Sequence, residues 1–238
     1  MIEVRDLTVR FGGVTPLDHI SVSFPTGTCG LIGPNGAGKT TFFNVLSGFV
    51  KPDTGTVRAF EEDLLALTDY RRARWGLRRT FQQEQAIARL SVFENVAMIH
   101  EHSNGERSTR RRDVLDAIQF VGLEAQPQQK VAVLTARDRR LVEIARAVVG
   151  RPRVVLLDEP AAGLPDEETQ HLSRVIQEIP ERFDALVVLV DHDMSLVSAC
   201  CQTTAVLDFG KLIASGPTAE VLRDEQVVRA YLGTEEQR

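Results

Sequence analysis

The segment from Gly33 to Thr40, Gly-Pro-Asn-Gly-Ala-Gly-Lys-Thr, fits the pattern G-x-x-x-x-G-K-[ST] at every defined position. In this pattern the glycines let the main chain pass close to a polyphosphate, which backbone N–H groups then surround. Lys39 would reach the β- and γ-phosphates, and the Thr40 hydroxyl would hold Mg²⁺. Residues 28–32 predict a strand before this loop, and residues 41–46 predict a helix whose N-terminus faces the anion. These flanks argue against a chance match, so we expect the chain to bind a nucleoside triphosphate.

The overall composition is that of a globular protein of 238 residues, long enough for one large domain or two small ones. Hydrophobic residues make up 43% of the chain and charged residues 26%, which is ordinary for a soluble domain. The net charge of −5 argues against a dedicated nucleic-acid binder, although arginines cluster at 71–79 and 107–112. Such runs are more often solvated faces than binding patches.

Neither a membrane span nor an export signal is visible in the sequence. The longest apolar run, 185–190, is far shorter than the ~20 residues that cross a bilayer. The N-terminus reads as a strand, Ile2-Glu3-Val4, rather than as a signal peptide. Cys29, Cys200 and Cys201 have no metal-ligand spacing, so we expect buried thiols in a reducing compartment. A cytoplasmic location follows as an expectation.

Hydrophobic periodicity predicts a mixed core of sheet and helix that is interrupted by a helical insertion. Residues 2–10 and 20–24 alternate as antiparallel strands do, and another short strand is expected within 53–60. The continuous apolar runs 154–157 and 186–190 are typical of strands buried on both faces of a parallel sheet. Between Ser91 and Val149 the pattern becomes helical, with a polar surface connection expected over 103–112.

A second nucleotide signature ends the strand Val154-Val155-Leu156-Leu157. Asp158 and Glu159 follow it, about 120 residues after the phosphate loop. Asp158 would lie at the carboxyl edge of the sheet and hold Mg²⁺ through water. Glu159 beside it would polarise the attacking water as general base. An ordinary strand exit could also carry two acids, but the combination with the phosphate loop favours catalysis.

These residues resemble the ATP-binding cassette (ABC) transporter ATPases over essentially the whole chain. The phosphate loop, the Asp158-Glu159 pair and His192 at a strand end occur in that family's order and spacing. The resemblance implies an α/β fold: a P-loop NTPase (RecA-like) core with an N-terminal antiparallel β subdomain and an inserted α-helical subdomain. It implies a single domain, 1–238, in which 1–82 and 150–238 form the core and 83–149 form the helical subdomain with a degenerate signature.

The resemblance also implies an active site for ATP hydrolysis, with ATP and Mg²⁺ bound. Its implied catalytic residues are Glu159, His192, Lys39 and Gln82, with the neighbouring Gln83 as a rival for Gln82. His192 would hold the γ-phosphate and the attacking water, and Phe11 would stack on adenine, although a core phenylalanine is the alternative. The metal residues would be Thr40, Gln82 and, through water, Asp158. The nucleotide-binding residues would be Phe11, Gly33, Pro34, Asn35, Gly36, Ala37, Gly38, Lys39, Thr40 and Thr41.

Two departures from the family pattern stand out. The family's Leu-Ser-Gly-Gly-Gln signature corresponds to Leu134-Thr135-Ala136-Arg137-Asp138, where an arginine replaces the glycine that approaches the γ-phosphate. A side chain there fills space that the phosphate needs, and a cation opposes the helix dipole. The alternative is that Arg137 supplies a guanidinium to the phosphate. After Leu164 the chain has Pro165-Asp166 where the family has Asp-Pro or Asn-Pro.

In such ATPases two cassettes sandwich two ATPs, and the signature acts on the ATP of the other subunit. The resemblance therefore leads to a hypothesis: this cassette is half of a heterodimer whose partner cassette has an intact signature. The resemblance also implies membrane permease subunits as partners and leaves open a periplasmic binding protein. It does not imply nucleic acid as a partner. The chain would lie in the cytoplasm, peripherally on the inner face of the cell membrane.

Within the family, the sequence of these motifs is most similar to that of ATPases for the uptake of branched-chain amino acids. Four segments show this likeness: Arg79-Thr80-Phe81-Gln82, Glu159-Pro160-Ala161-Ala162-Gly163-Leu164, His192-Asp193-Met194 and Tyr231-Leu232-Gly233. The implied function is powering the import of branched-chain or related amino acids. Two alternatives stay open: the ATPase of a lipopolysaccharide-type exporter, and a soluble regulatory ABC protein with weak hydrolysis.

Overall fold

A computed structural model describes residues 1–103 and 105–232 and divides the chain into two compact units. The first unit comprises Met1–Arg72 with Val188–Arg238, and the second comprises Ala73–Val187. The chain passes between them within α2 (Asp69–Trp75) and within β8 (Leu186–Val190). Gly233 and the polar tail after it lie outside the described residues.

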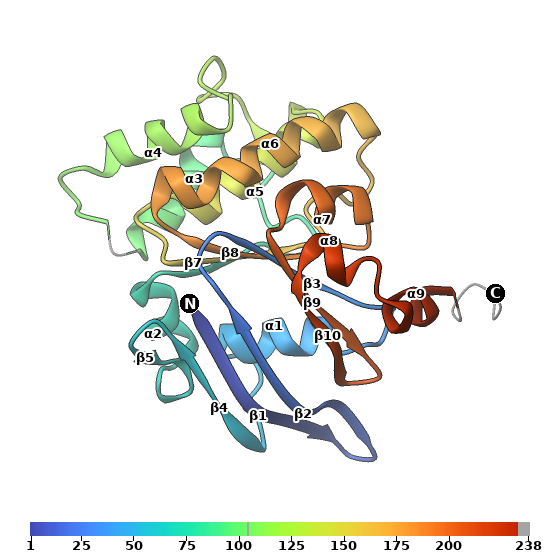
Figure 1. The fold of residues 1–238 in the computed structure, drawn as a ribbon. Coiled ribbons are helices and arrows are strands. Elements are labelled where there is room, and N and C mark those ends of the chain that lie inside the picture. The colour runs from blue at the N-terminus through green and yellow to red at the C-terminus, as the bar shows by residue number, and fades with distance from the viewer. Residues whose placement is uncertain (104, 233–238) are drawn as a thin grey trace. The chain divides into compact units, whose positions relative to one another are not determined.

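The first unit contains an antiparallel sheet in the order β2-β1-β4-β5, in which β1 pairs with both β2 and β4 (Figure 1). It also contains a parallel pair, β3 with β9, to which β10 adds in antiparallel fashion. The predicted strands at 2–10, 20–24, 28–32 and 53–60 are therefore confirmed. The strands and helices of this unit are β1 (Ile2–Phe11), β2 (Val14–Phe24), β3 (Thr28–Ile32), α1 (Lys39–Ser47), β4 (Thr54–Ala59), β5 (Glu62–Asp63), the 3-10 helix η1 (Leu64–Ala66), α7 (Met194–Cys200), β9 (Thr203–Asp208), β10 (Lys211–Pro217), α8 (Thr218–Val221) and α9 (Glu225–Leu232).

The second unit is mainly helical, and its strands β6 and β7 pair in parallel. Its elements are β6 (Leu77–Arg79), α3 (Val92–Glu101), α4 (Arg110–Phe120), the 3-10 helix η2 (Val131–Val133), α5 (Ala136–Val148), β7 (Val154–Asp158) and α6 (Asp166–Phe183). The helical insertion predicted after Ser91 is thus present. The connection predicted over 103–112 is shorter than expected, because α4 begins at Arg110, and Ser103 is buried rather than exposed.

Each unit has an apolar interior that explains its strands. All five residues of β7 and of β8 are buried, as expected for continuous apolar runs, and so are those of β3. The ring of Phe42 on α1 meets that of Phe24 on β2 edge to face, with centroids 5.9 Å apart. All three cysteines are buried thiols, as predicted, and burial raises the pKa of Cys201. No helix among the described residues is long and apolar enough to cross a membrane.

The helix that follows the phosphate loop is held at its C-terminal end by a buried arginine. Arg72 donates from Nη1 to the carbonyls of Val45 and of Leu46, the latter at 2.9 Å, and from Nε to that of Leu67 at 3.1 Å. The bond to Leu46 satisfies a carbonyl that the end of the helix leaves without a partner, whereas the carbonyl of Val45 also accepts from the N–H of Gly48. Burial lowers the pKa of Arg72, and the nearby Asp63 and Asp69 partly oppose this.

We therefore expect Arg72→Met to lower the free energy of unfolding by about 1–3 kcal/mol, since buried carbonyls lose their donors. Arg71→Met is the matched control, because the Arg71 side chain is exposed on the same helix and should change stability little. Urea unfolding followed by circular dichroism measures both variants. Equal stability of the two would show that Arg72 does not hold the end of α1.

Candidate active site

The phosphate loop connects β3 to α1 and is packed tightly on one side. Gly33 and Gly38 have φ angles of 149° and 107°. A Cβ on Gly33 would lie 2.0 Å from the carbonyl oxygen of Leu207, and a Cβ on Gly38 would lie 2.2 Å from that of Pro16. A Cβ on Gly36, in contrast, would meet nothing within 4 Å. The loop therefore needs glycine where it contacts other main chain, and it is open at Gly36.

The loop is also electrostatically suited to an anion. Lys39 is 9% exposed, and its ammonium group donates to the carbonyls of Gly33 at 2.6 Å and Pro34 at 2.9 Å. This places a cation within the loop at the start of α1, whose first turn contains no acidic residue. The helix dipole and the cation have the same sign there, so a polyphosphate fits this site. Thr40, in the same turn, is exposed.

Phe11 lies at the end of β1 and is 53% exposed. It pairs in register with Val14 across the turn, and Val14 is 65% exposed. The alternative interpretation of Phe11 as a core residue is therefore wrong. An aromatic face presented to solvent is available for stacking.

His192 follows β8 and belongs to a turn that is organised by two aspartates. Asp191 is buried, and its Oδ1 accepts from the backbone N–H groups of His192 at 2.8 Å and Asp193 at 3.0 Å. Asp193 caps α7 by accepting from Ser195 and Leu196, and these bonds lower the pKa of its carboxyl. The His192 side chain is 69% exposed and is thus available for a ligand on a fixed backbone.

The carboxylate pair ends β7 in the second unit. Asp158 is the last residue of the strand and forms a buried ion pair with Arg79, at 2.8 Å between Nη2 and Oδ2. Its backbone N–H donates to the Thr80 hydroxyl. Glu159 follows with a φ of 47°, which is unusual for a residue with a side chain. Residues held in such conformations cluster at functional sites, so this outlier supports a role for Glu159.

Gln82 contacts the proposed general base directly. Its Nε2 donates to Oε2 of Glu159 at 2.8 Å. For the rival Gln83, the described residues give no side-chain bond to Glu159. The geometry therefore favours Gln82 over Gln83 as the glutamine that acts with Glu159.

The degenerate signature forms the start of α5. Thr135 is the N-cap and accepts from the backbone N–H of Asp138 at 3.1 Å. Arg137 bonds through Nε and Nη2 to the same Oδ1 of Asp138, at 3.2 and 3.1 Å. The Arg137 side chain is 42% exposed, whereas the Asp138 side chain is 8% exposed. The charge of Arg137 is thus compensated within its own chain.

Four contacts were not anticipated from the sequence. Arg79 binds Asp158, Asp191 holds the backbone of His192, and Arg140 on α5 contacts the backbone at Gln82. Burial raises the pKa of Tyr231 on α9 to about 12, and the backbone of Gly33 beside it partly opposes this. Asp191 directly precedes His192 in the sequence, and that position could have indicated its contact with the His192 backbone. The other three pairs are distant in sequence, and no local pattern announces them.

The predicted site residues are thus divided between the units. Phe11, the phosphate loop with Lys39 and Thr40, and His192 belong to the first unit. Gln82, Asp158 and Glu159 belong to the second, as does the degenerate signature. The residues of the first unit form an anion cradle, and those of the second combine carboxylates with an amide.

Comparison with known proteins decides the family. A model described as "ABC transporter" matches residues 17–162, which is more than half of the chain. The chain belongs to the ABC transporter family. A second model, "Branched-chain amino acid ATP-binding cassette transporter", matches residues 211–237. The prediction of an ABC ATPase subunit with a P-loop NTPase fold is confirmed.

Relatives extend over nearly the whole length of the chain. The high-affinity branched-chain amino acid transport ATP-binding protein LivG of Escherichia coli K12 is 34% identical over 98% of each chain. The lipopolysaccharide export system ATP-binding protein LptB of the same strain is 33% identical over 98% of this chain and 97% of its own. Among solved structures, the ADP conformation of MJ1267, an ATP-binding cassette of an ABC transporter, superposes with a TM-score of 0.88 at 25% identity over 98% of each chain.

We expect Arg79→Met to destabilise the chain by about 3–5 kcal/mol, because it leaves the Asp158 carboxylate buried without its ion-pair partner. Arg229→Met removes an exposed pair with Glu225 on α9 and should cost little. Thermal and urea unfolding compare the two variants. A cost for Arg79→Met no larger than that for Arg229→Met would mean that Asp158 does not depend on Arg79.

Proposed function

We propose that this ABC ATPase powers the import of branched-chain or related amino acids across the cytoplasmic membrane. The name of LivG and the C-terminal model matched at residues 211–237 support this substrate class. The observation that most directly supports ATP hydrolysis is the hydrogen bond between Gln82 and Glu159 at the end of β7. It joins a general base to an amide that can orient water.

Each site residue has a proposed role. Glu159 accepts the proton of the attacking water, and Gln82 and His192 orient that water at the γ-phosphate. Lys39 balances charge on the β- and γ-phosphates, and Phe11 stacks on adenine. The N–H groups of the loop contact the phosphates, and this loop comprises Gly33, Pro34, Asn35, Gly36, Ala37, Gly38, Lys39, Thr40 and Thr41.

Magnesium would be held by Thr40, by Gln82 and, through water, by Asp158. These are oxygen ligands, and few protein ligands suffice because Mg²⁺ in such sites also binds the phosphates of the substrate. When bound, the ion neutralises charge on the transferring phosphoryl group. The described residues contain no cluster of three or more His, Cys, Asp or Glu that could hold a metal ion alone.

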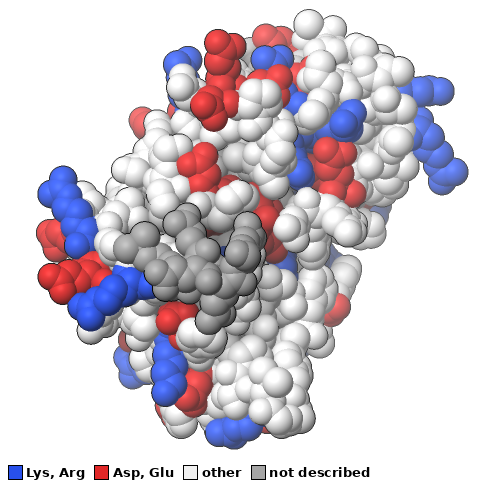
Figure 2. Space-filling view, turned by 90° about the vertical axis from the view of Figure 1, so that its right-hand side faces the viewer, with Lys and Arg blue, Asp and Glu red and all other residues white. Residues whose placement is uncertain are grey.

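We further propose that residues 83–149 act as the helical subdomain of a single domain, 1–238, whose core is 1–82 and 150–238. The chain would lie in the cytoplasm, on the inner face of the membrane, bound to permease subunits and served by a periplasmic binding protein. Nucleic acid is not a proposed partner. On the face in Figure 2 acidic and basic side chains are interspersed, and its described residues form no continuous basic stripe.

The partner cassette in this proposal is a different chain with an intact signature. The pair of Arg137 with Asp138 supports an impaired signature here, because a guanidinium already bound to a carboxylate is a weaker ligand for phosphate. The side chain also occupies the place of a glycine. The ATP held by this chain would be hydrolysed with the partner's signature, whereas the ATP of the partner would turn over slowly.

A lipopolysaccharide-type exporter is the second candidate, since LptB matches almost as well as LivG. The C-terminal match at 211–237 favours amino-acid import. Loss of leucine uptake on deletion of the gene, without a defect in lipopolysaccharide, would separate the two.

We expect Glu159→Gln to lower kcat for ATP by about 10²–10⁴-fold in the transporter complex purified through a tag on this chain, because the amide cannot accept a proton. The isolated chain should show negligible ATPase activity, since a homodimer would contain two impaired signatures. Glu181→Gln, at an exposed position near the end of α6, is the matched control and should retain activity. Robust turnover by the isolated chain would overturn the impaired-signature proposal.

Arg137→Gly should raise ATP turnover of the complex, because it restores space and N–H access at the second ATP. Steady-state phosphate release measures the change against the unmodified complex. Unaltered turnover in a correctly assembled complex would count against impairment by Arg137. This outcome would leave the Glu159-dependent activity of the first site untouched.

A further inference from the structure

The polar face of α5 binds the segment that begins at Gln82. Arg139 forms an ion pair with Glu84 at 3.0 Å. The buried Glu143 accepts from the backbone N–H of Gln85 at 2.8 Å. Residues spaced by three and four lie on one face of a helix, so α5 holds this segment at several points.

Arg140 on the same helix bonds to both sides of the catalytic pair. Its Nη1 donates to the carbonyl of Gln82 at 3.3 Å, and its Nη2 donates to the carbonyl of Ala162 at 3.2 Å. The N–H of Ala162 donates to the backbone carbonyl of Glu159 at 3.2 Å, and the side chain of Gln82 donates to the carboxylate of Glu159. These contacts close a ring that runs from Arg140 through Gln82, Glu159 and Ala162.

This ring includes a residue whose backbone conformation is unfavourable. Glu159 has a φ of 47°, a conformation that persists only where the surroundings hold it. Arg140 is half-buried, and its planar guanidinium offers two donors in a fixed fork. One side chain can therefore fix the distance between the Gln82 backbone and the turn after Glu159. A lysine, with one flexible ammonium group, could not bridge the two carbonyls in the same way.

We propose that Arg140 is a positioning residue for ATP hydrolysis, which aligns the Glu159 carboxylate and the Gln82 amide for the attacking water. This inference rests on the proposed ATPase function and deepens it. Arg140 acts through Glu159, not on the nucleotide. It also ties the catalytic pair to α5, whose first turn carries the degenerate signature at Thr135 and Arg137. Displacement of that turn would therefore reach Glu159 through Arg140.

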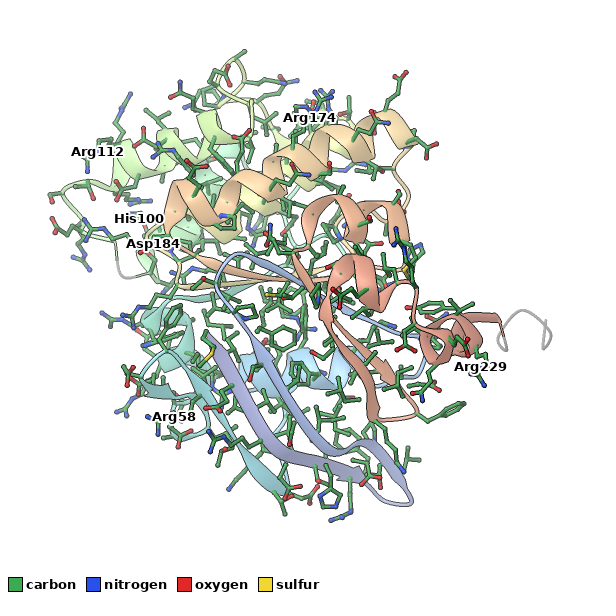
Figure 3. The ribbon with its side chains drawn as sticks, viewed as in Figure 1. Arg58, His100, Arg112, Arg174, Asp184 and Arg229 are labelled. Carbon is green, nitrogen blue, oxygen red and sulfur yellow. The ribbon has the colours of Figure 1, made fainter. Side chains whose placement is uncertain are left out.

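The test measures ATPase kinetics of the transporter complex purified through a tag on this chain. We expect Arg140→Met to lower kcat roughly ten- to hundredfold, because misplaced catalytic groups lose rate steeply. KM for ATP and the affinity for a non-hydrolysable ATP analogue should change by less than about twofold, since ground-state binding is untouched. Arg140→Lys should give an intermediate kcat. Arg174→Met is the matched control, because Arg174 is an exposed arginine on α6 and has no part in the ring (Figure 3).

A double mutant separates positioning from general damage. If Arg140 acts through Glu159, adding Arg140→Met to Glu159→Gln should lower kcat no further. A normal kcat for Arg140→Met, or the same fold loss in both backgrounds, would overturn the inference. Activity that is insensitive to Glu159→Gln would instead overturn the proposed function, and the role of Arg140 would fall with it.

Discussion

The close contact between the phosphate loop and the main chain of neighbouring strands is the constraint on which the nucleotide site depends. Gly33 lies against the carbonyl of Leu207 at the end of β9, and Gly38 lies against that of Pro16 in β2. No other residue type has room there, and both φ angles are positive. The packing fixes the loop before any ligand binds, so Lys39 and the start of α1 form a pre-organised anion site. Tyr231 adds a further contact from the C-terminal helix.

Glu159, the proposed general base, depends on a different kind of constraint, a network of hydrogen bonds within the second unit. Asp158 is held by Arg79 and Thr80, and Glu159 is held by Gln82 and by the turn through Ala162. The ion pair of Asp158 with Arg79 is buried, whereas the bond between Gln82 and Glu159 is exposed. Together these bonds restrict where the Glu159 carboxylate lies, which matters where a proton must be accepted at a defined point. The helix α5 supplies Arg140 to that network and also carries the altered signature. One helix thus links the element that would face a partner cassette to the chemistry of this one.

The contacts of Arg137 indicate what its replacement of a glycine does to the signature. Arg137 replaces a glycine, which by itself suggests either a blocked site or a new ligand for phosphate. The bonds from its guanidinium to the buried carboxylate of Asp138 favour the first interpretation. Thr135 still caps the helix, so α5 keeps its start although the glycines are gone. A structural role for the helix and a phosphate-binding role for its first turn are therefore separable.

Local patterns were sufficient to predict most strands of the fold and the phosphate loop. Apolar runs predicted β7 and β8, and glycine spacing with Lys39 predicted the phosphate loop after the short strand β3, because strand burial and loop conformation are local demands on residue type. The family resemblance added Phe11, Gln82 and His192. Only the tertiary structure brought Gln82 rather than Gln83 into contact with Glu159, placed Phe11 at the surface, and paired Arg79 with Asp158 and Arg140 with Gln82. The three contacts join residues that are more than fifty positions apart in the sequence. A single sequence does not show which distant polar groups meet when the chain folds.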